Sequence, residues 1–239
     1  MSPKIERTVN KERIARPIFN ITPFTLLDYP GKIACILWFA GCNMRCIYCY
    51  NPEIVMGKGK LFLDQAMVFI ESRKHLIDGV VLSGGECTLH RDIIPLTRNI
   101  KDKGLDVKID TNGALPERID EMINQGLVDY IALDFKSLPK NFESITGSRL
   151  FDAFESTLQL LIQSKIAYEV RTTVHSDLIS VDELKQMVKY LDTKGYKGKY
   201  YIQHFTNGKP TIGNINDGKP FKDLIQYSTK NIQIVERGF

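Results

Sequence analysis

The 239-residue sequence predicts an α/β fold built on a parallel sheet, and two observations support this prediction. Short apolar runs alternate six times with amphipathic segments through short connections, as in strands joined by crossover helices. Each apolar run also ends in a polar, glycine-rich or reactive cluster, and parallel sheets hold their functional sites at the carboxyl ends of the strands. Periodicity alone leaves open whether the sheet is doubly wound or a (β/α) barrel with fewer than eight units.

The expected strands and helices follow one another in a regular order. A first strand is expected over residues 33–39, because this run is almost continuously apolar, as in a strand covered on both faces. Later strands are expected over residues 79–82, 105–109, 128–133, 166–174 and 200–205, with a further short strand over 231–235. Helices are expected, from apolar residues at helical spacing, over residues 63–75, 92–103, 116–124, 151–164, 181–190 and 221–228. Asp92 is a capping-type residue, and Pro116 suits a first helical turn.

Composition and charge argue against several classes of function. The net charge is +4, with 43% hydrophobic and 25% charged residues, which is ordinary for a soluble globular protein. This small, dispersed excess does not indicate a nucleic-acid partner. The longest apolar stretch, residues 33–40, is too short to span a bilayer, so no membrane association is expected. The first residues lack the apolar segment of a secretory signal, and a cytoplasmic location is expected.

The cysteines are the most informative feature. There are five, an odd number, and Cys42, Cys46 and Cys49 form the spacing C-x3-C-x2-C. A disulfide framework is therefore not favoured, and a metal or redox site is. Structural zinc and simple iron–sulfur clusters normally take four protein ligands. Three thiolates on a four-iron cluster would leave one iron open to a substrate or cofactor. A zinc site completed by a distant His or by Cys87 is the alternative.

The remaining cysteines and polar motifs are less specific one by one. Cys35 lies inside the apolar run and is expected in the core. Cys87 is left open between a core residue and a thiol near the site. The sequences GGE and DTNG are each typical of turns, and an isolated Asp-x-Lys is typical of a solvated ion pair. Their occurrence at successive strand ends favours one shared cleft.

Five motifs together resemble a known family. The loop GCNMRCIYCYNPE is similar to the cluster-binding loop of radical S-adenosylmethionine (SAM) enzymes. LSGGE at 82–86, DTNG at 110–113 and LDFK at 133–136 resemble further motifs of that superfamily, in the same order. The stretch LLDYPGKIACILWFAGC at 26–42 resembles the opening of the glycyl-radical-enzyme activases. Within these, the likeness is greatest to the activating proteins of anaerobic ribonucleoside-triphosphate reductase, with the pyruvate formate-lyase activases next.

The resemblance implies a role for each matched residue. Cys42, Cys46 and Cys49 would ligate a [4Fe–4S] cluster whose open iron binds SAM. The other implied contacts of SAM are Gly84, Gly85 and Glu86 along the methionine part, Asp110 and Asn112 near the ribose and sulfonium, Tyr48 at the adenine, and Lys136 at the carboxylate. Asp110 and Asp134 are the implied ligands of a monovalent cation. Arg171 and His204 are carried over by strand position more than by motif. The chain departs from many family members in having Cys87, where they have proline.

The resemblance also implies a fold, a reaction and partners. The expected fold is a partial (β/α)6 TIM-type barrel of the radical SAM superfamily, with residues 1–19 as an N-terminal extension and 20–239 as one domain. The expected reaction is reductive SAM cleavage at the cluster, which generates a glycyl radical on a partner enzyme. That partner is expected to be anaerobic ribonucleoside-triphosphate reductase, with flavodoxin or ferredoxin as electron donor. The alternatives are a pyruvate formate-lyase-type activase, a radical SAM enzyme for a small molecule, and a non-enzymatic metal-binding module. Residues 207–219 are expected to form a mobile loop that closes the cleft or touches the partner.

Overall fold

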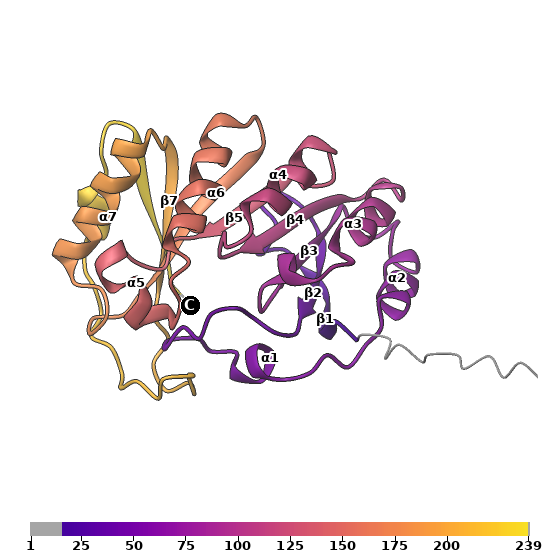
Figure 1. The fold of residues 1–239 in the computed structure, drawn as a ribbon, viewed down its shortest axis with the longest axis horizontal. Coiled ribbons are helices and arrows are strands. Elements are labelled where there is room, and N and C mark those ends of the chain that lie inside the picture. Colours follow the sequence, from indigo (N-terminus) through magenta and orange to yellow (C-terminus); the bar gives the residue numbers. More distant parts are fainter. Residues whose placement is uncertain (1–15, 239) are drawn as a thin grey trace, which may run out of the picture.

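One eight-stranded sheet organises the chain, and its strands lie in sequence order from β1 to β8 (Figure 1). The computed structural model describes residues 16–238. The strands are β1 (Ile18–Thr25), β2 (Ala34–Phe39), β3 (Gly79–Gly84), β4 (Asp106–Thr111), β5 (Tyr130–Asp134), β6 (Ala167–Val174), β7 (Gly198–His204) and β8 (Ile232–Arg237). β1 is antiparallel to β2, and every later neighbouring pair is parallel. Because β1 and β8 form the two edges, the sheet is open, as in a partial barrel.

This architecture confirms the expected α/β fold with a parallel sheet. β2 to β7 correspond to the six expected strands, and β8 to the further short strand over 231–235. The antiparallel strand β1 was not predicted, and it begins at Ile18, within the range expected as an extension. Residues 1–15 of that expected extension lie outside the described residues.

Helices follow most strands along the outer side of the sheet (Figure 1). They are α1 (Pro52–Met56), α2 (Leu63–Glu71), α3 (Ile93–Lys101), α4 (Pro116–Asn124), α5 (Pro139–Thr146), α6 (Phe151–Gln163) and α7 (Val181–Lys194), with short 3₁₀ turns η1 (Cys87–Leu89) and η2 (Leu224–Tyr227). α1 and α5 were not predicted. The helix expected over 221–228 was wrong, because Asp223 has a positive φ of 54° and only one 3₁₀ turn follows it. No helix of residues 16–238 is long and apolar enough to cross a membrane.

The core lies between the sheet and these helices. Outward-facing residues of the central strands, such as Ile109 and Leu133, are fully buried in it. Cys35 is buried in the same core, as expected. A smaller apolar cluster, centred on Tyr29 and Ile36, lies on the inner face at the amino ends of the strands. It leaves the carboxyl-terminal half of the inner face for polar groups.

Candidate active site

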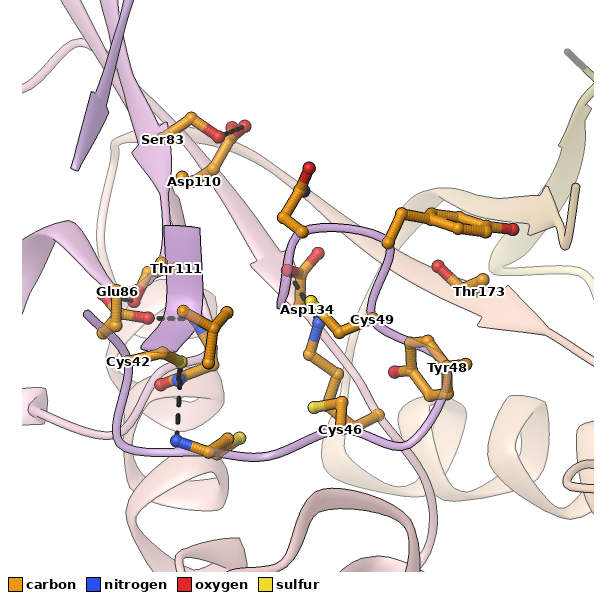
Figure 2. A pocket seen from close by; sticks show the side chains of 18 of the residues that line it. Cys42, Cys46, Tyr48, Cys49, Ser83, Glu86, Asp110, Thr111, Asp134 and Thr173 are labelled. Carbon is orange, nitrogen blue, oxygen red and sulfur yellow. Dashed lines mark hydrogen bonds and ion pairs between the residues drawn. The ribbon is translucent and has the colours of Figure 1, made fainter. Parts of the chain in front are cut away.

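A cleft of about 840 Å³ lies at the carboxyl ends of β2 to β6 (Figure 2). It brings together every predicted site residue except His204. The predicted residues that line it are Cys42, Cys46, Tyr48, Cys49, Gly84, Gly85, Glu86, Asp110, Asn112, Asp134, Lys136 and Arg171. Five consecutive strands and the loop after β2 therefore contribute to one site.

The three cysteines of the motif are free thiols on the loop that follows β2. Cys46 is buried, and burial raises the pKa of its thiol to about 11. Burial also raises the pKa of Cys42. Within residues 16–238, no three His, Cys, Asp or Glu side chains are grouped so as to hold one metal ion.

The cysteine loop is held by backbone hydrogen bonds on two sides. On one side the amides of Arg45 and Ile47 donate to the carbonyls of Thr146 and Ile145 at the end of α5, at 2.7 and 3.0 Å. On the other side the segment after β7 donates to the loop. The amide of Gly213 lies 2.8 Å from the carbonyl of Ile47, and that of Ile212 lies 3.2 Å from the carbonyl of Cys49. We call residues 206–218 the brace, because they fix the back of the cysteine loop.

The two glycines after β3 pack directly against the start of the cysteine loop. A Cβ on Gly85 would lie 1.8 Å from the carbonyl oxygen of Gly41. Gly84 has a φ of +114°, which favours glycine. The amide of Gly85 donates to the carbonyl of Phe39 at 2.8 Å, and that of Glu86 donates to Gly41 at 2.9 Å. Close backbone packing therefore requires these glycines, in addition to any approach of a ligand.

Glu86 and Asn112 connect neighbouring strand ends. The Glu86 carboxylate is buried and accepts hydrogen bonds from the Thr88 hydroxyl at 2.6 Å, the Thr111 hydroxyl at 3.0 Å and the Asn112 amide at 2.7 Å. Burial raises the pKa of Glu86, and these donors oppose the rise. The Asn112 side chain donates to Asn43 on the cysteine loop at 2.8 Å. Both side chains thus hold the loop and the strand ends together.

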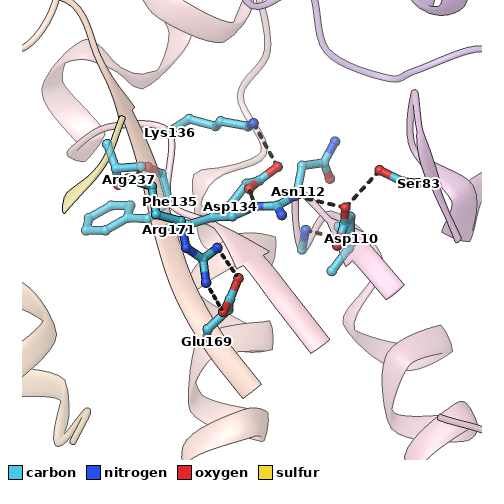
Figure 3. Close-up of polar contacts among 12 residues, drawn as sticks. Ser83, Asp110, Asn112, Asp134, Phe135, Lys136, Glu169, Arg171 and Arg237 are labelled. Carbon is cyan, nitrogen blue, oxygen red and sulfur yellow. Dashed lines mark hydrogen bonds and ion pairs between the residues drawn. The ribbon is translucent and has the colours of Figure 1, made fainter. Parts of the chain in front are cut away.

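Five charged side chains form a chain of ion pairs across the inner face, which we call the ion ladder: Lys108, Asp110, Arg171, Asp134 and Lys136. Figure 3 labels the part of it from Asp110 to Lys136. Burial by itself raises the pKa of both carboxyls. Arg171, with a lysine beside each carboxyl, outweighs burial, so the pKa of Asp110 falls to about 2 and that of Asp134 also falls. Burial lowers the pKa of Lys136, but Asp134 reverses this and raises it well above its ordinary value. Asp110, Asp134, Arg171 and Lys136 are therefore charged near neutral pH.

Tyr48 lies on the cysteine loop and is 5% exposed. Its hydroxyl is buried and has no hydrogen-bond partner among the described residues. The ammonium of Lys136 lies 5.9 Å from the centre of its ring. Tyr48 thus brings an aromatic face and an unsatisfied hydroxyl to the cleft, beside a cation.

His204 and Cys87 lie elsewhere. At the end of β7, the His204 imidazole contacts the Glu236 carboxylate of β8 at 2.7 Å, and His204 lines a separate hollow. The structure therefore does not bring it to the cleft of the other predicted residues. Cys87 is fully buried, and its thiol donates to the carbonyl of Asp110 at 3.6 Å. Burial raises the pKa of this thiol, and we assign Cys87 to the core beneath the site.

Sequence reasoning missed several residues around the cleft. Ser83 donates to Asp110 at 2.8 Å, and Lys108 pairs with the same carboxylate. Thr173, Trp38 and Tyr50 also line the cleft. The strand period could have identified two of these residues. Lys108 lies two positions before Asp110, and Thr173 lies two positions after Arg171. Side chains two apart on a strand share a face.

Comparisons with known proteins agree with this geometry. The family model described as "Radical SAM superfamily" matches residues 36–191. A Methanocaldococcus jannaschii protein, named provisionally a glycyl-radical enzyme activating enzyme, is 30% identical over 72% of this chain and 74% of its own length. The pyruvate formate-lyase-activating enzyme of Clostridium pasteurianum is 27% identical over 72% of this chain and 76% of its own.

Solved structures show the same fold. SuiB of Streptococcus suis, solved bound to S-adenosylmethionine, superimposes with a TM-score of 0.65 at 15% identity. The match covers 83% of this chain and 48% of SuiB, so this chain spans about half of that protein. The cofactors of the matched family are a [4Fe–4S] cluster and SAM, as the resemblance of the sequence motifs implied. On the family match, the fold and the three-thiol cleft, this chain belongs to the radical SAM superfamily.

Proposed function

We propose that this protein is an activase that uses SAM to install a glycyl radical on a partner enzyme. The observation that supports this most is a second opening, of about 950 Å³, lined by Leu27, Asp28 and Pro30 of the turn after β1. Arg171 lines both this opening and the thiol cleft. We infer that a polypeptide loop of the partner enters past the turn and approaches the cleft at Arg171. The names of the matched relatives in Methanocaldococcus jannaschii and Clostridium pasteurianum support the same class.

The residues of the cleft fit the two cofactors of the family. Cys42, Cys46 and Cys49 are three soft sulfur donors on one braced loop, which suits three irons of a four-iron cluster. Lys136 offers a fixed positive charge for the SAM carboxylate, and Tyr48 offers an aromatic face for the adenine. When bound, the cluster and SAM supply one-electron chemistry that leads to abstraction of a hydrogen atom from the substrate.

The chain itself supplies position and charge. Glu86 and Asn112 hold the strand ends against the cysteine loop, so they act on the cofactors through the loop. Gly84 and Gly85 let the backbone of β3 approach that loop. Asp110 and Asp134 are ionised and hold Arg171 and Lys136 in place. We assign no general base, because the reaction abstracts a hydrogen atom and needs no proton transfer by a side chain.

The turn after β1 offers an apolar surface at the second opening. Leu27 is 88% exposed and Leu26 is 62% exposed, although both are large apolar residues. Exposed apolar groups grouped at a site commonly mark a protein interface. We assign this turn to docking of the partner, with the acceptor glycine of the partner directed towards Arg171.

The first candidate partner is anaerobic ribonucleoside-triphosphate reductase, because residues 26–42 resemble the opening of its activating proteins. Pyruvate formate-lyase is the second, and the Clostridium pasteurianum relative favours it. A flavodoxin or ferredoxin would supply the electron. The cytoplasmic location that we expect for this protein agrees with such an electron donor.

The test mixes anaerobically reconstituted protein, reductant and SAM with each candidate partner. We expect a glycyl radical signal in electron paramagnetic resonance with one partner, and no signal when its acceptor glycine is replaced by alanine. SAM cleavage without a protein radical on any glycyl-radical enzyme tested would contradict the proposal and favour a small-molecule substrate.

A variant of the turn separates docking from chemistry. We expect Leu27→Asp to retain SAM cleavage in the absence of partner but to lose most of the partner radical. Val68→Asp, on another strongly exposed apolar residue, in α2, is the matched control and should keep both. Equal effects of the two variants would remove the turn from the interface.

A further inference from the structure

Arg171 stands between two carboxylates for which the family resemblance implies a monovalent metal ion. Its side chain, from β6, reaches Asp110 on β4 and Asp134 on β5 (Figure 3). Nη2 lies 3.4 Å from Oδ2 of Asp110, and Nε donates to Oδ1 of Asp134 at shorter range. The guanidinium therefore bridges the two residues that the ion would bridge.

The remaining carboxylate oxygens are also engaged. Oδ1 of Asp110 pairs with Lys108, and its Oδ2 also accepts a hydrogen bond from Ser83 at 2.8 Å. Oδ2 of Asp134 lies 3.0 Å from the ammonium of Lys136. Each of the four oxygens thus already has a cationic partner within the chain.

The charge balance leads to the same conclusion. The ion ladder holds three cations and two anions, so it already carries one excess positive charge. Its side chains are largely shielded from water, with exposed fractions that run from 2% for Lys108 to 20% for Asp134. A further cation here would face Arg171 at close range with little solvent screening, which is unfavourable.

We infer that Arg171 is the built-in cation of this site and takes the place of a monovalent metal ion. The rigid, permanently charged fork of a guanidinium suits this task, because it donates to Asp134 while it lies within ion-pair distance of Asp110. Lys136 then keeps its remaining N–H bonds for an anionic ligand group such as the SAM carboxylate. This inference concerns the SAM site alone and does not depend on the identity of the partner.

The first test measures SAM affinity of the cluster-loaded protein in potassium, sodium and choline chloride at one ionic strength. We expect the dissociation constants of the wild type to agree within about twofold. Arg171→Ala should bind SAM at least tenfold more weakly in choline chloride, and potassium or low millimolar guanidinium ions should restore much of that loss. Lys101→Ala is the matched control, since it removes a cation from Asp129 outside the cleft and should create no dependence on the added ion.

The second test needs no cofactor. In thermal unfolding of the apoprotein, we expect the melting temperature of the wild type to be the same in potassium and choline chloride. That of Arg171→Ala should rise when potassium or guanidinium ions are added. A several-fold gain in SAM affinity, or a clear rise in melting temperature, on adding potassium to the wild type would overturn the inference. This wild-type titration decides the matter even where Arg171→Ala does not fold.

Discussion

The two faces of the central strands carry opposite chemistry. On β4 the outward residues Val107 and Ile109 are buried against helices, whereas the inward residues Lys108 and Asp110 belong to the ion ladder. Apolar contacts on the outer face are many and individually small, so one loss is tolerated. The charges of the inner face depend on one another, because removing one partner leaves another charge buried and unpaired. The comparison teaches that one strand can serve stability on one side and a site on the other.

The largest expected difference is between a cysteine of the cleft, Cys46, and a cysteine of the outer core, Cys35. Cys46→Ala should lose the cluster and all SAM cleavage, because two thiols cannot replace three on the braced loop. Cys35→Ala, in the outer core, should keep full iron content and lower the free energy of unfolding by about 1–2 kcal/mol. Iron analysis, visible absorption and urea unfolding measure the two effects. A Cys46→Ala protein that still holds four irons would remove Cys46 from the ligand set.

The next effect separates a glycine that close backbone packing requires from a glycine that only its positive φ requires. In Gly85→Ala the new Cβ meets the carbonyl of Gly41, so the cysteine loop must shift, and we expect most of the cluster to be lost on reconstitution. Gly104→Ala is the matched control. Its φ is +76°, but its surroundings are open, so it should cost about 1 kcal/mol of stability and keep its iron. Equal iron content in the two variants would show that the packing of β3 on the loop is not needed.

The sequence predicted the inner face better than its supports. The motif residues at strand ends converge because parallel strands end at one edge, so Cys42, Glu86, Asp110 and Asp134 were found together. The alternation of polar and apolar residues in the strand that contains Lys108 also indicates a polar inner face. Only the run over residues 33–39 suggested a strand covered on both faces.

The supports of the cysteine loop could not be read from local pattern. α5 and the brace contact the loop through backbone amides and carbonyls, which every residue carries, so their sequences hold no mark of the contact. The expected mobile loop over 207–219 proved to include most of the brace. His204 was placed by strand position, but its pairing with Glu236 depends on β8, whose register could not be known beforehand.

A smaller effect tests the brace. In Gly213→Ala the new Cβ would lie 2.6 Å from Cβ of Ile47, so the brace must move off the loop. We expect a cluster that still assembles but loses iron to a chelator several-fold faster, at nearly unchanged thermal stability. Gly208→Ala changes the same segment at a position with open surroundings. Its φ of +74° makes alanine cost some stability, but the variant should keep the wild-type rate. If both variants release iron at the wild-type rate, the brace does not protect the cluster.

The smallest effect compares the faces through pH. The pKa of Asp110 is about 2 in the folded protein, against an ordinary value of 3.8, because Arg171 and Lys108 outweigh burial. As the pH falls, the carboxylate of Asp110 therefore takes up a proton at a higher pH in the unfolded chain than in the folded protein. The stabilisation from its ionised form is complete above about pH 4 and is lost as the pH falls towards 2. Asp134, with a pKa lowered in the same way, adds to this slope. Urea unfolding of the apoprotein between pH 7 and pH 2.5 should show the loss.

Ile109→Val, one position away on the outer face, should lower the stability by about 1 kcal/mol at every pH and leave the slope unchanged. A wild-type stability that is flat below pH 4 would mean that the ion ladder does not hold its carboxylates ionised.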